Sequence, residues 1–117
     1  MVFSAALLDG FSGEKKKTAD YRDLKSLGLQ KVYIGLESGH DPLLTFLNKP
    51  GSSQDVVRAV KEIKSGGVSV GIIVLLGAGG RLFAEKHVSD TIEVINQMDL
   101  DADDILYFSE LIENKDL

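Results

Sequence analysis

Four polar residues, Glu37-Ser38-Gly39-His40, directly follow the apolar run from Val32 to Leu36. A carboxylate in this position can accept hydrogen bonds from a pair of hydroxyl groups such as those of a ribose, and the Ser38 hydroxyl can add a polar contact. His40 brings an acid or a base, for which the sequence shows no partner. The structural alternative is that Glu37 or Ser38 caps the next helix or pairs with a neighbouring charge.

A second candidate is the glycine-rich stretch Leu75-Leu76-Gly77-Ala78-Gly79-Gly80-Arg81, which also follows an apolar run. It lacks the fingerprints of phosphate-binding loops, because Arg81-Leu82 stands where those loops need Lys-Ser/Thr or a further glycine. We therefore expect these glycines to bring the backbone close to a ligand or to turn it sharply into a helix. His87 has no second His or Cys at ligand spacing, so we expect it to cap a helix or to lie on the surface.

The elements that must position these residues recur at regular intervals. Apolar runs begin at residues 32, 68 and 105 and extend to Leu36, Leu76 and Phe108, and polar helical windows separate them. This alternation predicts a parallel sheet, and the interval matches the units from which ~250 residues build a (β/α)8 barrel. With a leading strand at residues 2–8, we expect an α/β fold: a partial (β/α) TIM-type barrel of about three to four parallel strands with flanking helices.

Local signals place the first two helices. Thr18 is expected to cap a helix that ends at Gly28, and Asp41 to cap a shorter helix with Pro42 at its first position. The first of these helices should bury the residues Tyr21, Leu24 and Leu27.

The later helices have stronger patterns. Ser52 with Asp55 three residues on resembles a capping box, and the apolar residues Val56, Val57, Val60 and Ile63 follow it on one face. A fourth helix is predicted over residues 85–98, with an inner stripe of Val88, Ile92, Ile95 and Met98.

Composition limits the function classes. The 117 residues are 44% hydrophobic and 26% charged, as expected for one domain with a single core. We expect residues 1–17 to form a leading strand and a flexible loop, residues 18–109 the strand-helix units, and residues 110–117 a tail. A net charge of −5 argues against nucleic-acid binding, and the apolar N-terminus is too short to span a membrane. The absence of cysteine excludes thiolate metal sites and fits a cytoplasmic protein.

The residues from Leu27 to Gly39, LGLQKVYIGLESG, together with Asp41, Leu44 and Leu47-Asn48-Lys49, carry a family resemblance. They resemble the central barrel region of radical S-adenosylmethionine (SAM) enzymes, in the branch that includes elongator-like and oxygen-independent coproporphyrinogen oxidase-like members. Residues 59–68, 75–80 and 87–91 resemble the following parts of that barrel. The resemblance covers most of the chain, from Tyr21 to Ser109.

The resemblance implies SAM as the cofactor. It implies that Glu37 and Ser38 contact the SAM ribose and that the stretch Val74, Leu75, Leu76 and Gly77 lies against the adenine. The family also holds a [4Fe-4S] cluster on a Cys-x-x-x-Cys-x-x-Cys loop, and this sequence contains no cysteine. We therefore expect a fragment of a radical SAM iron-sulfur oxidoreductase that forms part of the SAM pocket, ligates no metal and is inactive alone, with no catalytic residue assigned.

Two alternatives remain. The chain could be a cluster-free α/β module that binds a nucleotide-like ligand or completes a partner's barrel, or it could be a stable fragment with neither role. An open barrel leaves two sheet edges unpaired, so we expect a homodimer or a swapped assembly that covers them.

Overall fold

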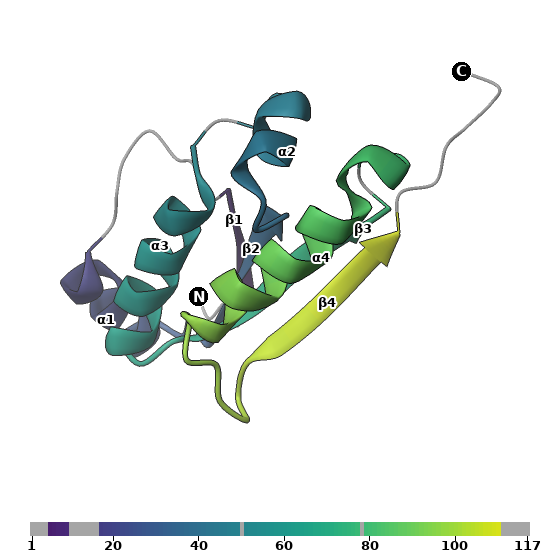
Figure 1. Cartoon of the computed structure of the whole chain (residues 1–117). Helices are drawn as coiled ribbons and strands as arrows, with labels where there is room; N and C mark the ends of the chain where they lie inside the picture. The colour runs from purple at the N-terminus through teal and green to yellow at the C-terminus, as the bar shows by residue number, and fades with distance from the viewer. Residues whose placement is uncertain (1–4, 10–16, 50, 78, 111–117) are drawn as a thin grey trace, which may run out of the picture.

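The computed structural model describes residues 5–9, 17–49, 51–77 and 79–110 (Figure 1). Within these ranges four parallel strands form one open sheet in the order β1-β2-β3-β4. The strands are β1 (Ala5–Asp9), β2 (Lys31–Glu37), β3 (Ser69–Leu76) and β4 (Ile105–Glu110). The predicted α/β class with a parallel, helix-flanked sheet is confirmed. Residues 2–4 of the expected first strand, the loop at 10–16 and the tail at 111–117 lie outside the described residues.

The connecting helices share one face of the sheet. Successive strands are joined by α1 (Thr18–Ser26), by the pair α2 (Asp41–Phe46) and α3 (Ser53–Ser65), and by α4 (Gly80–Asn96). Figure 1 shows α1, α3 and α4 side by side in front of the strands, with α2 beyond the end of β2. Parallel connections are almost always right-handed, so a sheet built in sequential order receives its helices on a single face.

The hydrophobic core fills the layer between this face and the helices. Alternate residues of β2 are buried, as expected for a strand with one covered face. The core side chains from the two central strands are Val32, Ile34, Leu36, Val70, Ile72 and Val74, and those from α3, α4 and the turn after α4 are Val56, Val57, Val60, Ile63, Val94 and Met98. Burial of such side chains contributes roughly 1.5–3 kcal/mol each to the stability of the fold.

The opposite face of the sheet is covered by no helix in the described ranges. Tyr33 of β2 and Tyr107 of β4 meet there, with ring centroids 5.7 Å apart. They meet above Gly71 of β3, where an added Cβ would lie 2.5 Å from the Tyr33 ring. We call this surface the helix-free face.

The capping box of α3 is confirmed, because Ser52 Oγ accepts from the Asp55 N–H at 3.3 Å and the Asp55 carboxylate accepts from the Ser52 N–H at 2.9 Å. The predicted cap at Asp41 is wrong. Asp41 is the first residue of α2, and its carboxylate accepts from the Ser53 N–H at 2.8 Å instead. A carboxylate can accept a hydrogen bond from the first residue of the next helix, and residue spacing within a single helix does not reveal such a contact.

The predictions for α1 also need correction. Lys17 precedes the helix, so Thr18 is its first residue, and the Thr18 N–H and hydroxyl donate to the Glu62 carboxylate of α3 at 2.5 and 2.6 Å. Leu27, expected on the buried face, is 62% exposed because the helix ends before it. The contact with α3 thus accounts for the start of α1, and the early end of the helix accounts for the exposure of Leu27.

The predicted inner stripe of α4 is wrong for two of its four residues. Val88 and Ile92 are 57% and 55% exposed, whereas the buried residues of this helix are His87, Thr91 and Val94. The helix also begins at Gly80, five residues earlier than its predicted start. Its orientation follows the hydrogen bonds of two polar side chains rather than its most apolar stripe.

An enclosed ion pair fixes the start of β4. The Asp104 side chain is 1% exposed and accepts from Lys64 of α3, from the Val70 N–H at 2.8 Å and from the Asp101 N–H at 2.9 Å. Burial alone raises the pKa of the Asp104 carboxyl, but these hydrogen bonds, the one from Lys64 first, outweigh burial and hold the pKa below its usual 3.8. One carboxylate thus joins α3, β3 and the turn before β4.

We expect Asp104→Asn to lower the free energy of unfolding by about 2 kcal/mol at pH 7, because charge-assisted hydrogen bonds are lost. The folded-state pKa of Asp104 is lowered, so its contribution is complete above the usual 3.8 and is lost as the pH falls through the lowered value. Urea denaturation at several pH values should show that the difference in free energy of unfolding between the wild type and Asp104→Asn shrinks as the pH falls through the lowered pKa of Asp104. The exposed control Asp103→Asn should change little, and a gap that stays constant down to pH 2 contradicts this account.

Candidate functional site

Glu37 ends β2 in a strained conformation. Its φ is +65°, and the pairing of β2 with β3 shifts register between Gly35 and Glu37. The Ser38 N–H closes a tight turn on the Leu36 carbonyl at 2.7 Å. A left-handed residue other than glycine costs about 1–2 kcal/mol, and such strain is concentrated at functional sites.

The Glu37 carboxylate lies back over its own strand. A Cβ added at Gly35 would lie 2.6 Å from Glu37 Oε1, so the missing side chain at this position makes room for the carboxylate. Gly35 and Glu37 alternate with the core residues of β2, which places both on the helix-free face. The half-buried carboxylate is therefore presented on that face, at the carboxyl end of β2.

Ser38 and His87 form a buried hydrogen-bonded pair. Ser38 is 0% exposed and its Oγ lies 2.6 Å from His87 Nδ1, while His87 Nε2 lies 2.8 Å from the Leu75 carbonyl oxygen. A carbonyl can only accept, so Nε2 carries the proton and Nδ1 accepts from the Ser38 hydroxyl. The prediction that His87 caps a helix or lies on the surface is wrong, because its partners lie in distant parts of the sequence.

Further contacts tie the same turn to α4. The Gly39 N–H donates to Thr91 Oγ1 at 2.8 Å, and a Cβ at Gly39 would lie 2.6 Å from the Asp90 carbonyl oxygen. His40 Nδ1 lies 2.7 Å from the Asp90 carboxylate, which is the partner that the sequence did not reveal. We call His87, Asp90 and Thr91 the α4 clamp.

The other predicted site residues lie at the end of β3. Val74 is the register partner of Glu37, but its side chain is 2% exposed and belongs to the core. Leu75 is half-buried and alternates with Val74, so its side chain lies on the helix-free face. Leu76 is 43% exposed, and Gly77 has a φ of +76° with open space where a Cβ would stand. Glu37, Leu75 and Gly77 are thus brought to one end of the sheet.

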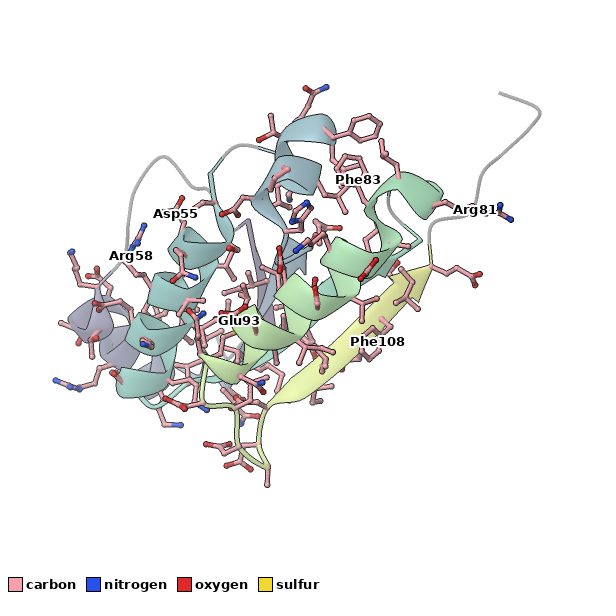
Figure 2. All side chains as sticks on the ribbon, viewed as in Figure 1. Asp55, Arg58, Arg81, Phe83, Glu93 and Phe108 are labelled. Atoms are coloured by element: carbon pink, nitrogen blue, oxygen red, sulfur yellow. The ribbon has the colours of Figure 1, made fainter. Side chains whose placement is uncertain are left out.

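Aromatic rings border this end on the helix side. The Phe83 ring lies 5.9 Å from the His40 ring and 5.2 Å from the ring of Phe46, which is 62% exposed. Figure 2 shows Phe83 where the start of α4 approaches α2. A Cβ at Gly79 would lie 2.4 Å from the Phe83 ring, so this glycine permits the close packing.

The side chains available as metal ligands limit which cofactor this chain can hold. The sequence has no cysteine to bind an iron-sulfur cluster, and among the described residues no three His, Asp or Glu side chains are grouped to hold a metal ion. The described residues therefore offer no ligand set for a cluster. A carboxylate beside apolar side chains and a glycine backbone fits a nucleoside instead.

Comparison with known proteins adds no relatives: neither a scan against protein-family models nor a search of curated proteins gives a match. In the described ranges, no helix is long and apolar enough to cross a membrane.

We expect Glu37→Gly to be about 1 kcal/mol more stable than Glu37→Ala, because glycine adopts a positive φ without steric cost whereas alanine retains the strain. Chemical denaturation of the two variants measures the difference. At Lys31, a half-buried residue of the same strand, the alanine variant should be more stable than the glycine variant. A Glu37→Ala variant as stable as Glu37→Gly would contradict the strain.

Proposed function

We propose that this chain is part of a (β/α) TIM-type barrel of the radical SAM kind, and that the ends of β2 and β3 bind the adenosyl part of SAM. The observation that carries the proposal is the Glu37 carboxylate, held in a left-handed turn over Gly35 beside the end of β3. The resemblance of Leu27 to Gly39 to radical SAM enzymes assigns the ribose contact to the same residue.

The arrangement of the sheet supports the barrel. Sequential parallel strands with helices on one face are typical of barrel segments, whereas doubly wound folds reverse their strand order and carry helices on both faces. In barrels, ligands bind at the carboxyl ends of strands. Glu37, Leu75 and Gly77 occupy that end here.

Each predicted residue then has a definite role. The Glu37 carboxylate accepts from the two ribose hydroxyls, and the adenine lies along the backbone of Val74 to Gly77 and the side chain of Leu75, while Leu76 contributes its backbone. Val74 contributes only its backbone, because its side chain lies in the core. Ser38 supports the turn from beneath, since its hydroxyl is buried against His87.

The proposal covers binding and not radical chemistry. When bound, a [4Fe-4S] cluster supplies the electron that cleaves SAM, and this chain has no thiolate to hold one. Any turnover therefore requires cysteines from another polypeptide segment. The cysteine-free sequence also fits the proposed cytoplasmic location.

Isothermal titration calorimetry with SAM and with adenosine tests this proposal. We expect both to bind, and Glu37→Gln to weaken binding about tenfold or more, because hydrogen bonds to a charged acceptor are lost. Gly35→Ala should also weaken binding, because the added methyl group displaces the carboxylate. Glu93→Gln, at an exposed position of α4 (Figure 2), is the matched control and should bind as the wild type does. No heat at millimolar ligand, with the fold intact by circular dichroism, contradicts the proposal.

A second role, completion of a barrel by a second copy of the chain, is favoured by the surface at β4. This edge strand pairs only with β3 among the described strands, and the side chains of Ile105, Tyr107 and Phe108 are 37%, 40% and 59% exposed. Val88 and Ile92 of α4 add further exposed apolar surface. Two copies together contribute eight strands, the number that closes a TIM barrel and removes its open edges. A homodimer or a swapped assembly achieves this.

Light scattering should therefore give the mass of a dimer. We expect Phe108→Lys to shift the protein toward monomer, because it places a charge at the open edge. Phe46→Lys is the control, since Phe46 is 62% exposed but lies on α2, away from β4. A wild-type protein that stays monomeric at high concentration rules out the second role.

A further inference from the structure

We infer that His87 is a positioning residue for nucleoside recognition: its imidazole joins the ends of β2 and β3 and thereby holds the Glu37 carboxylate in place for the ribose hydroxyls. The inference rests on the proposed function and assigns a role to a residue outside the ligand contacts. Both nitrogens of the buried His87 ring make hydrogen bonds, one to each strand end.

Each nitrogen of His87 holds a different strand end. Nδ1 accepts from the hydroxyl of Ser38, the neighbour of Glu37, at 2.6 Å, and Nε2–H donates to the Leu75 carbonyl at the end of β3 at 2.8 Å. The ring is 5% exposed, so water does not substitute readily for either partner. One planar group therefore joins the proposed ribose side to the proposed adenine side just beyond Glu37 and Val74, the last register pair of the two strands.

A buried imidazole is costly unless both of its nitrogens are hydrogen-bonded. An apolar residue would pack at this position of α4 without that requirement, as Val94 does about two turns later on the same face. What only the imidazole provides is a rigid donor and acceptor on opposite sides. Its presence in place of an aliphatic side chain points to the bridge.

The rest of the α4 clamp holds the same turn. Thr91 accepts from the Gly39 N–H, and Asp90 pairs with His40. The close approach of Gly39 to the α4 backbone leaves no room for the turn to shift toward the helix. Glu37, at the start of this fixed segment, is thus kept in its left-handed conformation with its carboxylate over Gly35.

The preference of the protein for a nucleoside with both ribose hydroxyls distinguishes a positioning role of His87 from a purely structural one. The readout is the ratio of the affinities for adenosine and for 2′,3′-dideoxyadenosine, which lacks the two hydroxyls assigned to Glu37. A variant that is merely less stable weakens both ligands alike or neither. A variant that misplaces the carboxylate lowers the ratio.

Two variants of His87 each remove one half of the bridge. The amide nitrogen of His87→Gln can replace Nε2 and donate to the Leu75 carbonyl, but no acceptor remains for Ser38. The amide oxygen of His87→Asn can replace Nδ1, but no donor reaches Leu75. We expect the wild type to prefer adenosine by about tenfold. Glu37→Gln and His87→Gln should lose most of this preference. His87→Asn should retain more of it, while binding both nucleosides more weakly.

Val94→Ala is the matched control, because Val94 is a buried residue of the same helix whose side chain has no polar atom to hydrogen-bond the turn. It should keep the full preference at a temperature where circular dichroism shows each variant folded. If His87→Gln does not fold, Ser38→Ala removes the same hydrogen bond together with the one that the Ser38 hydroxyl accepts from the His40 N–H at 3.0 Å, and should lose at least as much of the preference.

The outcomes distinguish the positioning role of His87 from the proposed function. A His87→Gln variant, or Ser38→Ala in its place, with the wild-type preference overturns the positioning role while the proposed function stands. A wild type that binds neither nucleoside, or binds both equally, overturns the proposed function and this inference with it. Independently of any ligand, ¹⁵N NMR of the His87 ring should show the proton on Nε2, and a ring that carries its proton on Nδ1 alone would overturn the bridge.

Discussion

The two hydrogen bonds of the His87 imidazole join α4 to the ends of β2 and β3, and the candidate site depends on them. Because Nε2–H donates to the Leu75 carbonyl and Nδ1 accepts from Ser38, α4 must turn this side chain inward. The outward orientation of Val88, the packing of Gly39 against α4 and the position of the Glu37 turn all follow from that choice. The open apolar surface beside β4 and the carboxylate at the end of β2 therefore have a common structural origin.

Much of the fold could be read from local signals. The apolar runs located β2, β3 and β4, and Ser52 with Asp55 located the start of α3, because these signals depend on neighbours within a few residues. The buried face of α4 could not be found by seeking the most apolar stripe. His87, Thr91, Val94 and Met98 share one face at helical spacing, and only the polar character of the first two hid this alternative.

The candidate site divides in the same way. Glu37 was identifiable as a carboxylate after a strand, but its positive φ, its place over Gly35 and the buried state of Ser38 depend on contacts with residues far along the chain. Ser38 and His87 are separated by 49 residues. Strain at Glu37 is tolerated because the α4 clamp stabilises the turn, a balance of local cost and long-range support that is expected where function requires a particular conformation.

Amide NMR mapping of adenosine binding tests the central claim most directly, namely that the ends of β2 and β3 together form a nucleoside site. The account predicts that titration with adenosine shifts the amide signals of residues 35–39 and 74–77, and shifts those of α3 little. Shifts confined to other regions, or none at millimolar adenosine in a folded sample, would contradict it.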